Sequence, residues 1–527
     1  MLTQKEMVKV RIYVYHRFFD AVVHELGTLA VLHQIDAKSE FAESGGHVAP
    51  IELGERYHTL RSLLGQTESL METLQLSPSQ SRPERGTLDE ESISELTSEI
   101  GAQLEGGLPA HEVASIFGER LRSAEIALKA EVARQEFQAR CGQTGKTKIT
   151  TGWIPREDLS STMNRLLEVS QRKLEYTVVE SVSHGSGPPS QISFPTRNSV
   201  LQSFSRLTTS FSAPRYREID PTLLQLVTYP LFFALMFGDV GHGLLLLLVG
   251  FGAEYLRRTG YRSGSLGNMV LDNAGFIVLL GVASTIVGAV SYGIVFGSAN
   301  WGHTLRELIG LGFLNSKEVW EIPFLFGVGI PVVFEPFKNP ISLFKLSLVI
   351  GTFHITLGIA ISVIDHIREG KRIDAFVGPG TWLIFYLSAV YLLFLLLSKG
   401  VKFAFSTDAM YIVLPPILLM LISRGVVHRG MGINESLESL LQSLSHTISY
   451  SRILAMAMIH EVLSMIFLGD LFGVPWPYNL LTVGVGAVVI LLLEGMLSMI
   501  QTIRLHWVEW FTKFYVGNGV KYSPFSL

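Results

Sequence analysis

Residues 444–460 read Leu-Ser-His-Thr-Ile-Ser-Tyr-Ser-Arg-Ile-Leu-Ala-Met-Ala-Met-Ile-His, an apolar stretch with Arg452 inside it. A guanidinium keeps its proton at any physiological pH, so a charge at membrane depth must face a partner, water or an ion path. Snorkelling to an interface does not fit a position so far from either end of the stretch. Arg452 is therefore either a functional charge or a structural charge paired with a carboxylate of another helix.

The composition assigns this stretch to a membrane protein. The chain has 527 residues, of which 48% are hydrophobic, so it is too long for one ordinary domain and too apolar for a typical soluble protein. Residues 1 to about 215 are rich in Glu, Arg, Gln and Ser, whereas most long apolar runs follow residue 221. The first residues contain no uninterrupted apolar segment and no small-residue cleavage site, so we expect no signal peptide and a cytoplasmic N-terminal half. Cys141 is the only cysteine, which excludes an internal disulfide and a cysteine-rich metal site.

The N-terminal part shows two strand-helix units. Residues 7–15 alternate and are β-branched, which predicts a strand, and a helical pattern follows over 16–35. A second unit reads as extended, helical and again extended, over 148–154, 157–173 and 176–182.

Between the two units lie two charged helical stretches, at about 51–76 and 88–140, separated by a Pro/Ser-rich segment. Such a pair predicts a helical hairpin, about 45–140, built as an antiparallel coil. Glycines and prolines at 185–189 mark a linker. We therefore predict an α+β cytoplasmic domain, residues 1–215.

Eight apolar segments fit the second domain that we predict, residues 216–527. They lie at about 221–237, 239–256, 271–297, 342–364, 375–398, 408–423, 440–468 and 480–503. Most reach the roughly 20 residues needed to cross about 30 Å of hydrocarbon. Only Gly238 and its neighbours separate the first two, so these form either two spans or a broken helix. The predicted fold is a membrane α-helical bundle of about eight transmembrane helices, the last two long and tilted.

Basic residues support a cytoplasmic N-terminus, because positive charge collects in short cytoplasmic loops. With eight spans, the loops on that side contain the basic residues near 257–262, 368–372 and 424–429. The opposite side has fewer basic residues, including Lys399 and three in the long segment near 298–341.

A polar stripe runs along the seventh segment. Glu438, Ser445 and Arg452 recur every seven residues, which places them within about 40° of each other on a helix. His460 falls about 80° around the helix from Arg452, whereas Glu461 lies nearly opposite and is expected to serve another contact.

The eighth segment contains Glu494, with Ser498 and Gln501 on the same face. Arg504 follows about 15 Å further along the helix, near two tryptophans that are typical of a membrane interface. A carboxyl group can take up and release protons, which an arginine cannot. Glu494 is thus a relay candidate and Arg452 a barrier or counter-ion, and a salt bridge between the two is compatible with both roles.

Residues 236–243, Met-Phe-Gly-Asp-Val-Gly-His-Gly, place Asp239 and His242 among glycines at the break between the first two segments. Irregular backbone at membrane depth must be buried in protein or line a cavity. The sequence leaves both a structural hinge and an ion site open.

Two further patterns resemble known functional motifs but lack residues that those motifs require. Gly142-Gln-Thr-Gly-Lys-Thr147 resembles a phosphate-binding loop but has Arg140 where that loop needs glycine, and it follows a predicted coil rather than a strand. His460-Glu461 lacks the second histidine of a zinc-protease helix. We therefore predict no catalytic site, no cofactor and no metal, and nothing indicates nucleic-acid binding.

Four stretches together are similar to one known family. They are Pro-Arg-Tyr-Arg-Glu-Ile-Asp-Pro-Thr (214–222), Phe-Phe-Ala-Leu-Met-Phe-Gly-Asp-Val-Gly-His-Gly (232–243), Ser-His-Thr-Ile-Ser-Tyr-Ser-Arg (445–452) and the Glu-Gly to Arg-Leu-His-Trp-Val-Glu segment (494–509). They resemble the membrane-embedded subunit a of rotary V-type ATPases, called subunit I in bacteria and archaea. Gly-Trp-Ile-Pro (152–155) resembles a short element of the same family's cytoplasmic domain.

The resemblance implies a non-catalytic stator that carries ions, with protons expected, past a rotating proteolipid c-ring. It implies that Arg452 faces the ring carboxylate between two aqueous half-channels, and that Glu438, His460, Glu494, Arg504 and Asp239 belong to those channels. It also implies partners: the c-ring, the subunit that caps the central stalk, the peripheral-stalk subunits and the lipid bilayer of a prokaryotic plasma membrane. ATP hydrolysis or synthesis would reside on other subunits.

Members of the family that this sequence resembles usually have a longer cytoplasmic arm, with a proximal lobe, an antiparallel coil and a distal lobe. Here only about 110 residues separate the first strand-helix unit from Gly-Trp-Ile-Pro, so the resemblance implies a shortened coil with a reduced or absent distal lobe. A secondary transporter with an intramembrane Arg/Glu site is the main alternative, although residues 221–364 and 375–503 show none of the self-similarity typical of that class. A membrane scaffold or receptor would not need Arg452 and Glu494 in successive segments.

Overall fold

The computed structural model describes residues 5–527 except 37–48, 52, 75, 77–89, 107, 180–188, 190–198, 217, 262–263, 317–319, 324–328, 334, 400–405, 428–429 and 468–477. The predicted Pro/Ser-rich turn before residue 88 and residues 185–188 of the predicted linker lie outside the described residues, as do Arg262 and Arg429 of the predicted basic loops.

The chain divides into two compact units. The sheet unit comprises Thr3–Ser193, Arg215–Arg217 and Asn518–Leu527. The helix unit comprises Phe194–Pro214 and Glu218–Gly517, with Met1–Leu2.

An antiparallel sheet is the centre of the sheet unit. Strand β1 (Met7–Tyr15) pairs along its whole length with β5 (Thr147–Pro155) and also with β6 (Leu174–Val178). Strand β2 (His33–Ile35) pairs with β5, and the short β3 (Ala49–Pro50) and β4 (Gly142–Gln143) extend that side of the sheet. Helices α1 (Phe19–Leu29) and α6 (Arg156–Val169) pack together and contribute to one apolar core with β1. Both predicted strand-helix units are present.

The expected helix over 16–35 is too long. Helix α1 ends at Leu29, because Ala30 takes the left-handed conformation with φ 50°, and residues 33–35 form β2. Gly152 explains how β2 fits beside β5: a side chain there would lie 2.5 Å from the carbonyl oxygen of His33. The Gly-Trp-Ile-Pro element is thus a strand end that must lack a side chain at its first position.

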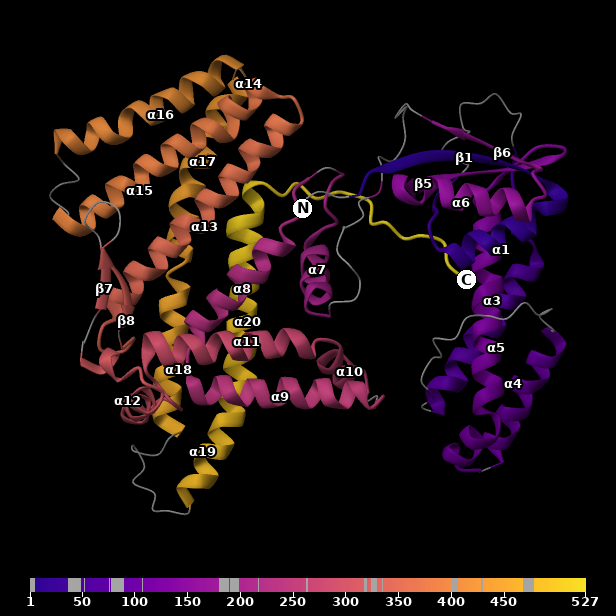
Figure 1. Cartoon of the computed structure of the whole chain (residues 1–527), viewed down its shortest axis with the longest axis horizontal. Coiled ribbons are helices and arrows are strands. Elements are labelled where there is room, and N and C mark those ends of the chain that lie inside the picture. Colours follow the sequence, from indigo (N-terminus) through magenta and orange to yellow (C-terminus); the bar gives the residue numbers. More distant parts are fainter. Residues whose placement is uncertain are drawn as a thin grey trace. The chain divides into compact units, whose positions relative to one another are not determined.

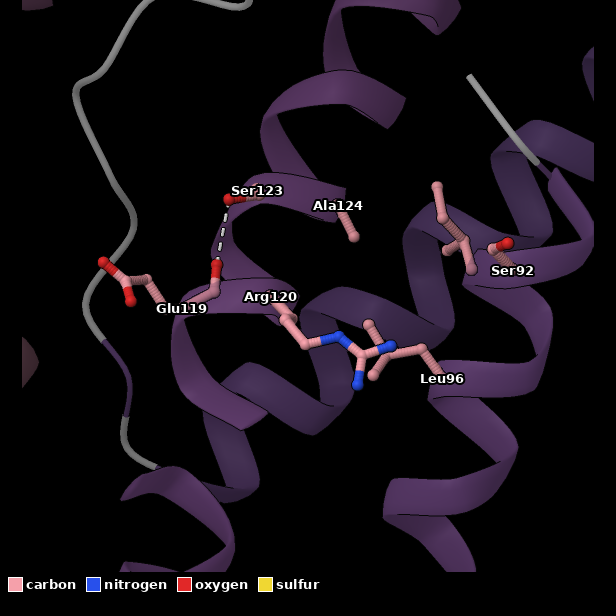
Figure 2. A pocket seen from close by; sticks show the side chains of 7 residues that line it. Ser92, Leu96, Glu119, Arg120, Ser123 and Ala124 are labelled. Atoms are coloured by element: carbon pink, nitrogen blue, oxygen red, sulfur yellow. Dashed lines mark hydrogen bonds between the residues drawn. The ribbon is translucent and has the colours of Figure 1, made fainter. Parts of the chain in front are cut away.

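The predicted helical coil forms, but its second stretch is divided. The region 88–140 contains two helices instead of one, α4 (Glu90–Glu105) and α5 (Ala110–Ala139). Helix α3 (Glu55–Thr73) packs against both of them. Gly106 and Pro109 lie at the division, where a glycine and a proline end one helix and begin the next. An open pocket of about 490 Å³ lies between α4 and α5, with Arg120 and Ser92 on its walls (Figure 2).

In the helix unit, all eight predicted apolar segments contain helices. The elements are α7 (Ser199–Phe211), α8 (Thr222–Met236), α9 (Val240–Arg258), α10 (Ser265–Asp272), α11 (Ala274–Val287), η2 (Gly288–Tyr292), α12 (Ala299–Leu308), η3 (Gly312–Ser316), β7 (Trp320–Pro323), β8 (Gly329–Val333), α13 (Pro340–Arg368), α14 (Arg372–Ala375), η5 (Phe376–Gly380), α15 (Thr381–Lys399), α16 (Thr407–Val427), α17 (Gly430–Ser449), α18 (Arg452–Phe467), α19 (Tyr478–Val489), η7 (Ile490–Glu494), α20 (Gly495–Arg504), η8 (Leu505–Trp510) and η9 (Phe511–Lys513).

Seven helical segments in the described part of the chain are long and apolar enough to cross a membrane, so the protein is an integral membrane protein. They are Val240–Arg258, Ala274–Tyr292, Pro340–Arg368, Arg372–Leu396, Thr407–Val427, Met431–Phe467 and Gly484–Lys513. The predicted first span is the shorter helix α8, which has 15 residues and ends before the break at Phe237–Asp239. The last two segments are long, with 37 and 30 residues. In Figure 1, α20 runs nearly up the page and α9 and α11 run across it.

Glycines bring α9 and α11 into close antiparallel contact (Figure 1). A methyl group at Gly250 would lie 2.9 Å from the backbone nitrogen of Val278, and one at Gly281 would lie 2.9 Å from that of Leu247. Gly288 is equally tight, because a methyl group there would meet the backbone of Asp239 at 2.8 Å. Small residues that let helix backbones approach are the usual device of membrane helix packing. This pair therefore holds the Asp239 turn in place.

We predict that Gly250→Val destabilises the helix unit by about 1–3 kcal/mol, the usual cost of overpacking, because the new side chain meets both the backbone and the short, branched side chain of Val278. Gly252→Val is the matched control two residues away on α9, since nothing lies within 4 Å of a methyl group there. Denaturant unfolding in detergent micelles measures both free energies. Equal values for the two variants would contradict the packing described here.

We also predict that Cys141 is inert in the folded sheet unit. Its thiol is buried, donates to the carbonyl oxygen of Phe137 at 3.3 Å, and has its pKa raised by burial from 9.0 to about 12. The thiolate fraction at pH 8 is then about a thousandfold below that of an unfolded chain. Because the folded pKa exceeds the unfolded one, this thiol's contribution to stability is present below pH 9 and is lost as the pH rises toward 12. Maleimide labelling with and without denaturant checks this, and equal rates would refute it.

Candidate functional site

Arg452 lies well inside the span Met431–Phe467, 21 residues from its start (452 − 431) and 15 from its end (467 − 452). It is the first residue of α18 and follows the turn at residues 450–451 that separates α18 from α17. Its guanidinium donates to Oε1 of Glu509 at 2.8 Å and to the hydroxyl of Ser449 at 3.3 Å. The two partners differ in environment, because the Arg452 side chain is 24% exposed and the Glu509 side chain is 1% exposed. The cation is therefore fixed from inside the helix unit and remains accessible on its outer side.

This pairing corrects one sequence interpretation. Glu494 was a candidate partner of Arg452, but the structure pairs Arg452 with Glu509 and pairs Glu494 with His460. Glu461 makes the separate contact that its helical phase indicated, since its carboxylate accepts from the backbone N–H of Phe337 at 2.8 Å.

Asp239 occupies the break between α8 and α9 and is fully buried. Its Oδ1 accepts from the backbone N–H groups of His242 at 3.0 Å and Phe296 at 2.9 Å, and its Oδ2 accepts from that of Gly297 at 2.6 Å. Phe296 and Gly297 both have positive φ, 47° and 75°, which points successive N–H groups at the carboxylate. Asp239 thus caps α9 and ties the break to the loop after η2.

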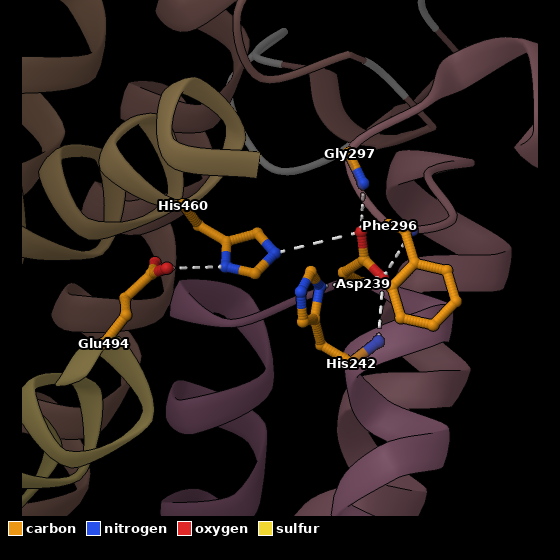
Figure 3. A network of polar contacts seen from close by, with 6 residues as sticks. All are labelled: Asp239, His242, Phe296, Gly297, His460 and Glu494. Atoms are coloured by element: carbon orange, nitrogen blue, oxygen red, sulfur yellow. Dashed lines mark hydrogen bonds and ion pairs between the residues drawn. The ribbon is translucent and has the colours of Figure 1, made fainter. Parts of the chain in front are cut away.

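His460 lies between two carboxylates (Figure 3). Its Nδ1 is 2.9 Å from Oε2 of Glu494, and its Nε2 is 3.9 Å from Oδ2 of Asp239. His242 adds a second imidazole, with Nδ1 3.3 Å from Oδ1 of Asp239. We call Asp239, His242, His460 and Glu494 the buried acid–imidazole cluster; each is at most 3% exposed. The sequence indicated Asp239, His460 and Glu494 separately, and the structure brings them together.

The buried polar character continues along the last span toward Arg452. Ser498 lies one turn after Glu494 on α20, and Gln501 follows before η8, which carries Glu509. In the described chain, the hydroxyl of Ser498, Oε1 of Gln501 and Oε1 of Glu494 are buried atoms without a hydrogen-bond partner. Buried polar atoms are normally satisfied by protein or ordered water, so these atoms can hold water molecules.

A second polar region lies before Arg452, on α17. Glu438 is exposed and accepts from the side-chain amide of Gln442 at 2.9 Å, and the Gln442 oxygen accepts from Lys513 at 3.3 Å. Glu438 and Gln442 line a cavity of about 340 Å³ together with His366 and Asp374. Two polar regions therefore lie on opposite sides of Arg452 along the α17–α18 span.

One arginine differs from its expected place. Arg424 counted as a basic residue of a loop, but it lies within α16, is buried, and donates to Gly378 O at 2.8 Å and to the Ser439 hydroxyl at 2.7 Å. These hydrogen bonds join the π-helical segment η5 to α17. Arg504 is exposed at the end of α20, and the described part of the structure records no hydrogen bond or ion pair for it.

Sequence reasoning missed Glu509 and Lys513 as members of this network. Both come after η7, which ends at Glu494; Glu509 lies within η8 (Leu505–Trp510), and Lys513 follows η8. A π-helical segment adds a residue to a turn and changes which face the following side chains occupy, so a regular 3.6-residue period misplaces them. The available signal was the charge of Glu509 between Trp507 and Trp510. We interpreted the two tryptophans as a membrane-interface pattern and did not consider the charge between them.

The fold and site define a multi-pass membrane protein with a fixed intramembrane cation between two polar regions. The chain belongs to the V-type ATPase 116kDa subunit family, whose profile it matches over residues 119–432 and 426–527. This confirms the resemblance seen in the four sequence stretches.

Individual relatives of the chain carry names from the same family. The A-type ATP synthase subunit I of Methanocaldococcus jannaschii is 25% identical over 428 residues, covering 76% of this chain and 58% of the relative. The vacuolar proton translocating ATPase 100 kDa subunit of Dictyostelium discoideum is 26% identical, covering 72% and 58%. The human V-type proton ATPase 116 kDa subunit a 2 is 22% identical, covering 73% and 61%. The chain thus spans about three fifths of the length of these relatives.

We predict that Glu509→Gln lowers the free energy of unfolding by about 2–3 kcal/mol, because it leaves the Arg452 guanidinium without its buried partner. Arg452→Gln combined with Glu509→Gln should lose less than the sum of the two single losses, by about 1 kcal/mol or more. Arg504→Gln is the control, with a change within about 0.5 kcal/mol because the side chain is exposed. Additive losses in the double variant would show that the pair is not coupled.

Proposed function

We propose that this chain is the stator subunit of the membrane sector of a V/A-type rotary ATPase and couples ion transport, with protons expected, to rotation of a proteolipid ring. The family membership and the names of the relatives support this class. The single structural observation that carries it is Arg452: a permanent cation deep in a span, fixed from inside by Glu509 and accessible on the outside.

The face around Arg452 fits an apolar rotating partner. Leu441, Leu444 and Ile448 on α17 are 71%, 65% and 54% exposed, and Ile459 on α18 is 45% exposed. The last span adds Leu492, which is 64% exposed. A carboxylate carried past this face in an apolar environment would meet one fixed positive charge, which favours its ionised form at that point.

Two polar regions would supply the ion to and from that carboxylate. The cavity at Glu438 and Gln442 suits one half-channel, and the buried acid–imidazole cluster with Ser498 and Gln501 suits the other. An imidazole between two carboxylates can accept a proton from one side and release it on the other. Arg452 cannot release its proton, so it separates the two regions and direct leakage is blocked. Arg504, exposed near the end of α20, would act at the outer margin of this path.

We further propose that residues 1–215 form a cytoplasmic domain that docks to stalk subunits and that 216–527 form the transmembrane domain. The expected partners are the c-ring, the central-stalk-capping subunit and the peripheral stalk, with catalysis on other subunits. A prokaryotic plasma membrane is the expected location. A secondary transporter is not favoured, because the chain belongs to the rotary ATPase family.

Replacement of Arg452 tests this function. Arg452→Ala should abolish ATP-driven ion transport in vesicles while the complex still assembles, because the ring carboxylate loses its fixed counter-charge. Arg258→Ala is the matched control: it removes an exposed arginine at the end of α9 whose partner is Glu254. Transport follows from quenching of a pH-sensitive dye, and assembly from copurification with the proteolipid. Normal pumping by assembled Arg452→Ala would contradict the proposal.

A further inference from the structure

Three potential metal ligands converge in the buried acid–imidazole cluster. One carboxylate oxygen of Asp239, one ring nitrogen of His242 and one of His460 lie within 4.8 Å of one another. They come from the break before α9, the first turn of α9 and the middle of α18. Figure 3 shows the His460 ring directed at the Asp239 carboxylate, with His242 beside it.

The spacing is close to that of a tetrahedral metal site. Ligands at 2.0–2.2 Å from Zn²⁺ lie about 3.4 Å from each other. The His460 Nε2 to Asp239 Oδ2 distance is 3.9 Å, and the three ligand atoms all lie within 4.8 Å of one another. Small rotations of the two imidazole rings toward Asp239 close the difference.

Both ring nitrogens are available. His242 Nδ1 and His460 Nε2 are buried atoms without a hydrogen-bond partner in the described chain, and both face the Asp239 carboxylate. Oδ2 of Asp239 accepts one N–H, that of Gly297, and keeps a second lone pair.

The surrounding contacts match those that orient metal ligands. His460 places its other nitrogen, Nδ1, 2.9 Å from the Glu494 carboxylate, which is the carboxylate–histidine arrangement found behind metal-bound imidazoles. The Asp239 carboxylate is held by three backbone N–H groups. Phe237 and Phe296 pack their rings against the two imidazoles at 4.8 and 5.2 Å and exclude bulk water.

From this geometry we propose that Asp239, His242 and His460 bind a divalent transition-metal ion, with Zn²⁺ as the probe, and that the bound ion closes the polar path at this point. Two imidazoles and one carboxylate suit Zn²⁺ or Co²⁺ and are a poor site for Mg²⁺ or Ca²⁺, which take oxygen ligands. A water molecule completes the tetrahedron. Binding of the ion is independent of the proposed transport role, whereas closure of the path rests on it.

Binding is tested on the full-length protein in detergent micelles. Co²⁺ titration of the metal-free protein should produce the visible bands of tetrahedral Co²⁺, one ion per chain, and Zn²⁺ should displace them. His242→Asn and His460→Asn should each abolish the bands, and Glu494→Gln should weaken binding about 10–100-fold by removing the carboxylate behind His460. His303→Asn is the control, because His303 is a partly exposed histidine near Glu335 and offers only a surface site.

X-ray absorption of the Zn²⁺-loaded wild-type protein gives a second measurement that needs no variant to fold. Two imidazoles among four nitrogen or oxygen ligands are expected. An octahedral spectrum, or binding that persists in His242→Asn, would overturn the site.

In vesicles that carry out ATP-driven transport, Zn²⁺ should inhibit transport by the wild-type protein and by the His303→Asn control. Transport should recover when a chelator removes the ion. Tetrahedral binding without inhibition would overturn closure of the path alone, whereas normal pumping by Arg452→Ala would overturn the proposed function and leave the metal site standing.

Discussion

The ion pair between Arg452 and Glu509 is the constraint on which the helix unit depends. A guanidinium in a membrane span cannot be neutralised, so its charge must be met by a carboxylate that is itself desolvated. Glu509 meets it from the core, where Trp510 and Tyr450 are fully buried. The contact joins the last two spans, Met431–Phe467 and Gly484–Lys513, at one level and sets which of their faces look inward.

The other end of the same two segments is joined by His460 and Glu494, and there α9 takes part through Asp239. That carboxylate has its position because glycines let α9 and α11 approach, and because the turn at Phe296 and Gly297 offers two N–H groups. A structural hinge and a polar site, which the sequence left as alternatives, are thus the same residue. The helix packing, the break and the proposed ion path form one connected arrangement.

Much of this was predictable from local pattern. Hydrophobic period and segment length gave the spans, and alternation gave β1 and β5, because each depends on neighbouring residues only. The partners of Arg452 and Glu494 were not predictable, since two π-helical segments shift the phase of the last span. Arg424 was missed because its contacts join elements distant in the sequence. The division between α4 and α5 is local, at Gly106 and Pro109, and was missed because the charged helical pattern continues on both sides of it.

The central claim is that Arg452 separates two polar paths. The most direct measurement is passive proton leak, without ATP, through vesicles that contain this chain assembled with its proteolipid ring and carry an imposed pH gradient. The account predicts that Arg452→Ala dissipates the gradient faster than the wild-type assembly, because the barrier between the two polar regions is gone. Equal rates of dissipation in the two assemblies would contradict the barrier role.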